Sequence, residues 1–301
     1  MDVVWIQDVI ENQRCLCLFV KYKDKPDILL YMLTLSTCFY IMKSKFGPSK
    51  YIDWMNNFIS ISNNFKLVIY TNEESASHIN IRQNPNIKIV IKPFDQFYCY
   101  KFRESWIKNH AKNTMLNEQS QFNTDWELNM LWSEKIAFVR ETMRQKYFET
   151  EYYGWCDIGY FRNRQNDTHI SRLMAWPNPV KIGALDKNKV HYACVNNSTE
   201  YVNRLARLIN VRNHAGLPAQ QIPPQQYSVA GGFFLLHGTK IDWWFDLYYS
   251  RLESYFKYDY LVKDDQIIIA DCVFSNMGHF KIYYENNSAV DNWFMFQRLL
   301  L

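Results

Sequence analysis

The sequence predicts an α/β protein whose sheet is mixed but mostly parallel and is flanked by helices. Short apolar and aromatic runs alternate along the chain with longer segments in which apolar residues recur at helical spacing. Such an order is typical of parallel strands with helices on their faces. The composition agrees, because 301 residues with 48% hydrophobic and 21% charged residues describe a globular chain, long enough for one large domain or two small ones.

The first part of the chain contains a lead-in and three predicted strands. Residues 1–26 are expected to be a variable N-terminal segment with a candidate strand at residues 15–21. Residues 29–39 are rich in Leu, Thr and aromatic side chains and predict a buried first strand. Residues 65–70 and 86–92 predict the second and third strands.

A helix is predicted between the first two strands. Ser49 follows a Phe-Gly-Pro loop and is expected to cap this helix. Its apolar residues at helical spacing are Ile52, Met55, Phe58 and Ile59. The chain contains neither GxGxxG nor GxxxxGK[ST], so the sequence gives no support for dinucleotide-binding or P-loop functions.

Two helical segments with a polar loop between them are predicted next. Residues 96–117 are aromatic and basic and are expected to be helical, while residues 109–125 are polar enough for a surface loop. A further helix is predicted over residues 126–143. One face of it contains Leu128, Leu131, Trp132, Lys135, Val139 and Met143.

Lys135 thus lies within an apolar stripe, and two interpretations are open. The side chain can extend to the edge of the stripe, as lysines usually do. Alternatively, it delivers a cation to an anionic site beside Asp157. Glu134, one position off the stripe, is the expected partner of Lys135.

The chain is organised around residues 152–164. Gly154 and the aromatic residues of 152–156 disfavour a helix and predict a strand buried on both faces. Asp157 follows directly. Because ligands of open α/β sheets bind outside the carboxyl ends of the strands, Asp157 is predicted to meet a phosphate-bound metal or a sugar hydroxyl. Gly159 permits close approach to the backbone. The alternative is an Asp that hydrogen-bonds its own loop where the strand turns.

Basic residues follow this strand end. Arg162 and Arg164 offer planar donors suited to phosphate. Farther along, residues 180–185 are a candidate strand and residues 200–208 an amphipathic helix.

Two glycines open the last clearly predicted strand, over residues 228–236. Gly231 and Gly232 weaken a strand unless backbone or ligand must approach closely there, so a functional role is favoured. Thr239 is then expected to cap a helix whose inner face contains Ile241, Trp244, Phe245, Tyr248 and Leu252. Asp264 and Asp265 fall in the first turn of another helix, where the helix dipole favours carboxylates without any catalytic role.

Composition restricts the classes of partner and compartment. The net charge of +4 is small and the basic residues are dispersed, so no nucleic-acid partner is expected, whereas an anionic small-molecule substrate is compatible. Seven cysteines, an odd number without regular spacing, favour a reducing compartment over a disulfide framework, and the lack of a CxxC pair disfavours structural zinc.

A cytoplasmic location is expected. The N-terminus lacks the basic-then-apolar order of a signal peptide, and the most hydrophobic stretch, residues 28–42, is too short and polar for a transmembrane segment. Abundant Asn, Ile, Lys and Tyr is typical of AT-rich coding sequences, as in some large DNA viruses or AT-rich microbes. For a viral source, the host cytoplasm is the expected location.

Four short motifs together resemble the HtrL/YibB-like protein family. They are Trp-Ser-Glu-Lys at 132–135, Trp-Cys-Asp-Ile-Gly-Tyr-Phe-Arg at 155–162, Val-Ala-Gly-Gly-Phe at 229–233 and Asp-Gln at 265–266. The first strand, the helix start at 51–54 and the strand at 68–71 are also similar to that family. The resemblance covers about residues 29–285, and the motif around Asp157 is its most specific part.

This resemblance implies a GT-A-type glycosyltransferase fold, one Rossmann-like domain over residues 27–301. The implied donor is a nucleoside-diphosphate sugar, UDP- or GDP-linked, and the implied acceptor is a hydroxyl of a glycan or protein. Mn²⁺ or Mg²⁺ is the implied cofactor. In that fold an Asp-x-Asp motif usually holds the metal. Here Trp155 stands where the first carboxylate of that motif would be, so Asp157 is its one carboxylate. A late histidine often completes such sites, and the implied metal ligands are therefore Asp157 and His279.

The resemblance also implies the remaining site residues. Asp265 and Asp157 would be catalytic, with Asp265 as the general base of an inverting enzyme or the stabiliser of an oxocarbenium-like species in a retaining one. The implied donor-binding residues are Thr37, Tyr70, Lys135, Arg162, Gly231, Gly232 and Gln266. Two other functions remain open: a catalytically silent nucleotide- or sugar-binding protein on the same fold, and a glycoside or nucleotide-sugar hydrolase that uses Asp157 and Asp265 as an acid and base pair.

Overall fold

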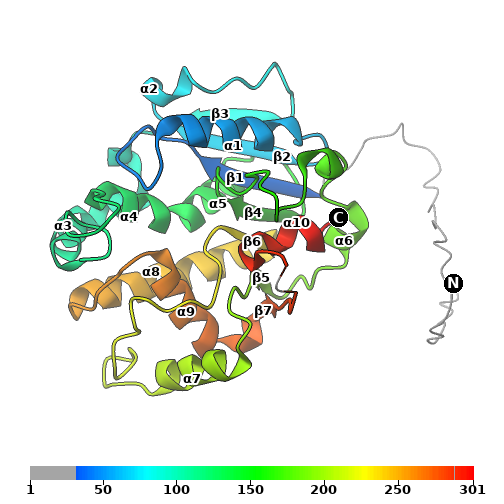
Figure 1. Ribbon diagram of the computed structural model, residues 1–301. Helices are drawn as coiled ribbons and strands as arrows, with labels where there is room; N and C mark the ends of the chain where they lie inside the picture. The colour runs from blue at the N-terminus through cyan, green and yellow to red at the C-terminus, as the bar shows by residue number, and fades with distance from the viewer. Residues whose placement is uncertain (1–31, 288) are drawn as a thin grey trace, which may run out of the picture. The chain divides into compact units, whose positions relative to one another are not determined.

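A single mixed sheet runs through the described part of the chain (Figure 1). The computed structural model describes residues 32–287 and 289–301, and in this part the sheet has seven strands in the order β3-β2-β1-β4-β6-β5-β7. The strands are β1 (Leu33–Cys38), β2 (Lys66–Thr71), β3 (Ile87–Ile91), β4 (Tyr152–Cys156), β5 (Val190–Ala193), β6 (Phe233–His237) and β7 (Phe280–Tyr283). The predicted lead-in, its strand at 15–21 and the domain boundary at residue 27 lie outside the described residues.

The sheet is mostly parallel, as the sequence predicts. Strand β1 pairs in parallel with β2 and β4, and β2 pairs in parallel with β3. Strand β6 is antiparallel to both β4 and β5, whereas β5 and β7 are parallel. This α/β architecture is compatible with a Rossmann-like fold.

Alternating side chains of the strands enter two cores, one on each face of the sheet. In β2, Val68 and Tyr70 pack on one face and Leu67 and Ile69 on the other. The first face is covered by α3 (Arg103–Lys112), α4 (Trp126–Ser133), α5 (Lys135–Arg144), α7 (Thr199–Asn210), α8 (Ile241–Lys257) and α9 (Asp265–Ser275). The second face is covered by α1 (Pro48–Ser60), α6 (Pro179–Gly183) and α10 (Met295–Leu299).

Strand β4 lies at the centre and is buried on both faces, which confirms the prediction for residues 152–156. Gly154 pairs with Leu35 on one side and Leu235 on the other. A Cβ atom at this position would lie 2.3 Å from the Phe234 carbonyl oxygen. Glycine is therefore required for the close approach of β4 and β6.

Two predicted helix caps are wrong. Helix α1 has Gly47 at its N-cap and begins with Pro48, whose fixed φ and missing N–H suit the first helical position, so Ser49 is already inside the helix. Thr239 lies within the short 3₁₀ helix η4 (Gly238–Lys240), which His237 caps, and α8 begins only after Lys240.

Residues 180–185 are not a strand, because α6 occupies Pro179–Gly183. The Asn178 side chain accepts a hydrogen bond from the Val180 N–H, and Pro179 takes the first helical position. This Asn-Pro start is a helix signal, which outweighs the apolar character of the segment.

The two helical segments predicted over residues 96–117 and 126–143, with a polar loop between them, are divided into more elements than predicted. The short 3₁₀ helices η1 (Phe94–Gln96) and η2 (Tyr98–Phe102) precede α3, which extends to Lys112, and the following turn buries Asn113 and Thr124 rather than exposing them. The predicted helix at 126–143 divides at Glu134 into α4 and α5. The remaining short elements are α2 (Glu73–Ala76), η3 (Ile170–Leu173), η5 (Met277–His279) and η6 (Asn292–Phe294).

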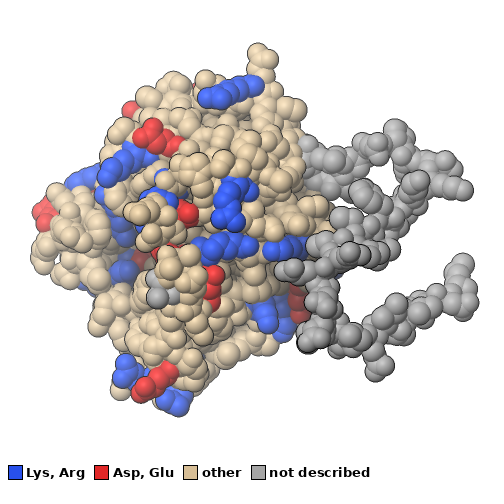
Figure 2. Space-filling view, turned by 45° about the vertical axis from the view of Figure 1, so that its right-hand side comes forward, with Lys and Arg blue, Asp and Glu red and all other residues tan. Residues whose placement is uncertain are grey.

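Charged side chains are mixed over the face of the molecule in Figure 2. Lys and Arg side chains lie among Asp and Glu there and do not gather into one stripe. Within the described ranges, no helix has both the length and the apolar character that crossing a bilayer requires.

Candidate functional site

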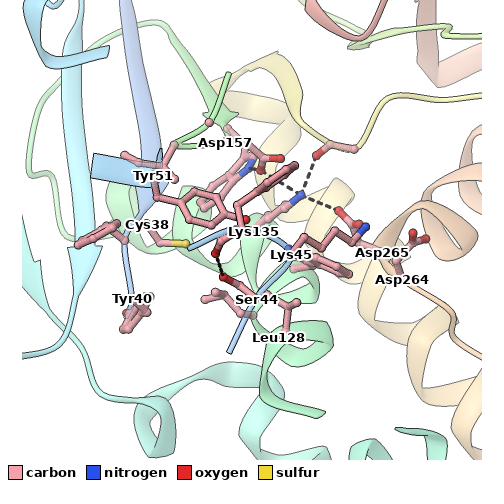
Figure 3. A pocket seen from close by; sticks show the side chains of 18 of the residues that line it. Cys38, Tyr40, Ser44, Lys45, Tyr51, Leu128, Lys135, Asp157, Asp264 and Asp265 are labelled. Atoms are coloured by element: carbon pink, nitrogen blue, oxygen red, sulfur yellow. Dashed lines mark hydrogen bonds and ion pairs between the residues drawn. The ribbon is translucent and has the colours of Figure 1, made fainter. Parts of the chain in front are cut away.

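A pocket lies beyond the carboxyl ends of β1 and β4 (Figure 3). Its walls come from the loop after β1, from α4 and the start of α5, from the turn after β4 and from the start of α9. The cavity has a volume of about 180 Å³. This is the edge of the sheet where the sequence predicts ligand binding, and Asp157 lines it.

Lys135 links the two candidate catalytic carboxylates. Its ammonium Nζ lies 3.1 Å from Asp157 Oδ1 and 2.9 Å from Asp265 Oδ2, and it donates a 2.9 Å hydrogen bond to the Gly231 carbonyl oxygen. The side chain is almost completely buried. Lys135 therefore does not extend to the edge of its helix, and the interpretation that places its cation beside Asp157 is confirmed.

The break between α4 and α5 fixes Lys135 in this place. Glu134, at the break, is buried, and its carboxylate accepts hydrogen bonds from the backbone N–H groups of Tyr98 at 2.7 Å and Cys99 at 2.8 Å. Burial raises the pKa of Glu134 to about 7, although these two donors act in the opposite direction. The predicted pairing of Glu134 with Lys135 is wrong, because Glu134 is occupied by the start of η2.

The positive charge of Lys135 is balanced by carboxylates of the protein itself. Burial by itself would lower the pKa of the Lys135 ammonium, but the carboxylates of Asp157 and Asp265 outweigh it and hold this pKa above its usual value. The Lys135 side chain is therefore positively charged at neutral pH. It neutralises much of the negative charge that the two aspartates bring into the pocket.

Asp157 is held by the strand that it follows. Its backbone N–H donates to the Gly232 carbonyl oxygen at 2.8 Å, and its Oδ1 accepts a 2.6 Å hydrogen bond from Trp155 Nε1. The side chain is 33% exposed, so Asp157 can meet a ligand in the pocket. The alternative in which Asp157 only bonds its own turn is not what the structure shows, because its carboxylate faces Lys135.

The two glycines before β6 make room for these side chains. A Cβ atom on Gly231 would lie 3.0 Å from Asp265 Oδ2. On Gly232 it would lie 2.7 Å from Trp293 Nε1 and 3.2 Å from Asp157 Oδ2. The expectation of a close approach at this glycine pair is confirmed. The groups that approach it are the side chains of Asp157, Asp265 and Trp293, which line the pocket.

Asp265 is the first residue of α9, and its side chain is only 6% exposed. Burial raises the pKa of its carboxyl to about 6, while the Lys135 charge counteracts this and Asp264 adds to it. Asp264 is also buried. Its Oδ1 has no hydrogen-bond partner among the described residues, while Oδ2 pairs with Lys263. A buried carboxylate oxygen without a hydrogen bond destabilises the fold.

Several residues of the pocket were not predicted. Lys45 comes from the loop after β1, and the rings of Tyr40, Tyr51, Trp132 and Trp293 form much of the apolar wall. The signal available for Lys45 and Tyr40 is their position just after the carboxyl end of a predicted strand. Trp132 and Trp293 have no such signal.

The other predicted site residues divide into two groups. Arg162, Gly231 and Gln266 line the pocket, and Gln266 Nε2 donates to the Val229 carbonyl oxygen at 3.0 Å. Thr37 and Tyr70 are buried and are not among the lining residues. The Tyr70 hydroxyl lies within hydrogen-bond distance of the Phe138 carbonyl oxygen at 3.1 Å and of Thr142 Oγ1 at 2.9 Å, in the core.

His279 is not part of the pocket wall either. It lies in η5, and its ring is 4.7 Å from the ring of Trp243, centre to centre. Among the described residues no three His, Cys, Asp or Glu side chains are grouped so that they could hold a metal ion. The oxygens that Asp157 and Asp265 direct inward already contact the Lys135 ammonium, and a divalent cation between them would be repelled by it. A divalent cation therefore does not fit between these two oxygens.

Neither the family models nor the curated proteins include a match to this chain. What the chain itself shows is an α/β fold with a mixed, mostly parallel sheet and a charged, aromatic-walled pocket at the carboxyl ends of two central strands.

Proposed function

We propose that the protein is a glycosyltransferase that moves a sugar from a nucleoside-diphosphate sugar, UDP- or GDP-linked, to a hydroxyl of a glycan or protein. The observation that supports this most strongly is the contact of Lys135 with both Asp157 and the buried Asp265, in a pocket beyond the carboxyl ends of β1 and β4. Asp265, a buried carboxylate in a pocket with a raised pKa, has the features of a catalytic group.

The lining of the pocket suits the parts of such a donor. Aromatic rings such as Tyr51 and Trp132 offer flat apolar surfaces for a nucleobase or a sugar ring. The Asp157 carboxylate, which is 33% exposed and lines the pocket, would accept a hydrogen bond from a sugar hydroxyl. Cationic side chains at the same pocket would attract the diphosphate.

Asp265 is the proposed general base of an inverting transfer. Its carboxylate would take the proton of the acceptor hydroxyl while the acceptor oxygen forms a bond to the anomeric carbon of the donor. The bond from that carbon to the diphosphate oxygen breaks, and its electron pair leaves with the nucleoside diphosphate. In a retaining transfer the same carboxylate would instead stabilise the positive charge that develops on the sugar.

Asp157 and Lys135 have positioning and electrostatic roles in this proposal. Lys135 would hold the Asp157 and Asp265 carboxylates at opposite sides of one ammonium group. The fixed arrangement would orient Asp265 without the reorganisation that free side chains need during the reaction.

The test is donor turnover by the full chain and by Asp265→Asn. The chain is incubated with UDP- and GDP-sugars and a panel of glycan and peptide acceptors, and release of nucleoside diphosphate is measured. We expect Asp265→Asn to lower kcat by about 10²-fold or more with donor affinity retained, because a general base contributes about 10²–10⁴-fold. Asp246→Asn makes the same change on an exposed part of α8 and is the matched control, with unchanged kcat expected.

Incubation with donor alone distinguishes the two other functions. Release of free sugar without an acceptor would support a hydrolase that uses Asp157 and Asp265. Tight nucleotide binding without turnover under any condition would support a silent binding protein. Normal kcat in Asp265→Asn would contradict the assignment of the base.

A further inference from the structure

The cations of the pocket are of two kinds. Lys135 is paired with two carboxylates, as described above. Lys45 and Arg162 also line the pocket, and within residues 32–287 and 289–301 neither has a carboxylate within ion-pair distance. Of the three lining carboxylates, Asp157 and Asp265 face Lys135, and Asp264 pairs with Lys263, which does not line the pocket. The unpaired charge of the pocket is therefore positive.

Lys45 is held in place by rings rather than by an anion. Its Nζ lies 4.7 Å from the centre of the Trp132 ring and 4.9 Å from that of Phe122. The side chain is half-buried, and desolvation lowers the pKa of its ammonium, against the influence of Asp264. A partly buried cation without an anionic partner destabilises a fold, so it is expected where a ligand supplies the missing charge.

Arg162 is fixed in a similar way. Its guanidinium lies over the ring of Trp54, 4.5 Å from the ring centre, and 5.6 Å from that of Phe46. Its Nε donates to the Gly159 carbonyl oxygen at 2.8 Å. The terminal nitrogens have no hydrogen-bond partner among the described residues, which leaves planar donors for phosphate oxygens.

Phe46 connects these two groups. It follows Lys45 in the chain, its ring contacts the Arg162 guanidinium, and all three residues line the same pocket. The loop after β1 and the turn after β4 thus each bring an unpaired cation to one cavity.

We propose that Lys45 and Arg162 form an anion subsite that binds the diphosphate of the ligand directly, without a divalent cation. Lys135 takes part of the place in the charge balance that a metal would otherwise fill, because its single positive charge already offsets one of the two negative charges of Asp157 and Asp265. That the anion is a nucleoside diphosphate rests on the proposed function, whereas binding of a diphosphate group does not.

The test is calorimetric titration with inorganic pyrophosphate, UDP and GDP, each in EDTA and in Mn²⁺. We expect the wild-type chain to bind pyrophosphate and at least one nucleotide in EDTA, with a Kd within threefold of that in Mn²⁺. Lys45→Gln and Arg162→Gln should each weaken binding by about 10-fold or more, since hydrogen bonds to charged groups are strong. Lys45→Arg keeps the charge and should lose less than Lys45→Gln.

The controls remove the same charges outside the subsite. Lys43→Gln changes a lysine two residues before Lys45. The Lys43 side chain is exposed and pairs with Asp125 at the surface. Arg172→Gln lies in η3 and is also exposed. Both should leave Kd within twofold, and the melting temperature of each variant shows that it is folded.

The outcomes separate this subsite from the proposed function. Nucleotide binding that is lost in EDTA and restored by Mn²⁺ would overturn the subsite, even if sugar transfer is found. Equal losses in Lys43→Gln and Lys45→Gln would also overturn it. Binding in EDTA that depends on Lys45 and Arg162, without any sugar transfer, would support the subsite and contradict the glycosyltransferase. No binding of pyrophosphate or nucleotide in either buffer would contradict both.

Discussion

At the scale of single residues, the site is built on one lysine between two aspartates. Removing one member of a buried ion pair usually destabilises a protein by about 3–5 kcal/mol, because the other charge is then left uncompensated in a medium of low dielectric constant. Lys135, with its contacts to Asp157, Asp265 and Gly231, is therefore a structural residue as well as a site residue. Asp265 is better suited to experiment because its pKa falls in an accessible range.

We predict that the activity of the protein has an acid limb near pH 6. Burial raises the pKa of Asp265 to about 6, so a base at this position loses its proton only above that pH. The value of kcat/KM should fall about tenfold for each pH unit below the limb. A pH profile of donor turnover measures this, and Asp265→Asn should remove the limb from its residual activity. A profile that stays flat to pH 4.5 would rule out Asp265 as the titrating base.

The raised pKa of Asp265 also makes the free energy of unfolding depend on pH, which can be measured without a substrate. The folded-state pKa is raised from the unfolded value of 3.8, so the folded chain binds the proton more tightly than the unfolded one. The contribution of Asp265 to stability is thus fully present below about pH 4, is lost as the pH rises toward 6 and changes little above. The free energy of unfolding of the wild type, relative to Asp265→Asn, should follow this direction.

At the scale of elements, the spacing of β4 and β6 positions Asp157 and the Gly231–Gly232 pair. The antiparallel ladder runs from Tyr152 opposite His237 to Cys156 opposite Phe233, and it continues in the hydrogen bond from the Asp157 N–H to Gly232. Gly154 lies in the middle of this ladder, so its lack of a side chain sets how closely the two strands pack.

We predict that Gly154→Ala destabilises the fold by about 1–3 kcal/mol or more, the range for overpacked cores. The added Cβ would lie 2.3 Å from a backbone oxygen, which cannot move as a flexible side chain could. Denaturant unfolding measures the change. Gly278→Ala is the matched control, because no atom of the described residues lies within 4 Å of its added Cβ, and a change of about ±0.5 kcal/mol is expected. Equal midpoints for both variants would show that the strands separate easily.

At the scale of the whole molecule, the pocket depends on segments far apart in the chain. Lys135 donates to Gly231, 96 residues later, and the walls include residues from Cys38 to Trp293. A ligand in the pocket would contact several elements at once. It should therefore stabilise the native state as a whole, and not one loop.

We predict that a nucleoside diphosphate raises the melting temperature. A ligand at about 100 times its Kd stabilises the native state by about 2.7 kcal/mol. This corresponds to several degrees, given about 2–4 °C per kcal/mol in somewhat smaller domains. A panel of nucleoside mono- and diphosphates measures it, and a shift confined to one base would identify the nucleotide of the donor. If no diphosphate changes the melting temperature, the pocket is not a nucleotide site.

Local patterns in the sequence were sufficient for most elements and for part of the site. The aromatic run at 152–156 is β4, and the amphipathic segment at 200–208 lies within α7. Asp157 was found because a strand end is a local feature. The predicted cap at Ser49, the predicted strand at 180–185 and the predicted unbroken helix at 126–143 are wrong. Each depends on where a helix starts, which is set by Pro48, by Pro179 and by the distant hydrogen-bond partners of Glu134.

Local patterns predict the α/β class, the strand that ends at Asp157 and the carboxylate at the start of α9, because periodicity and residue type act over a few neighbouring residues. Three features of the site depend on the packing of the folded chain. Lys135 faces Asp157 and Asp265, Lys45 and Arg162 meet at one cavity, and Tyr70 and His279 lie outside the pocket wall. These contacts join residues distant in the chain, and their geometry is set by how the helices pack on the two faces of the sheet.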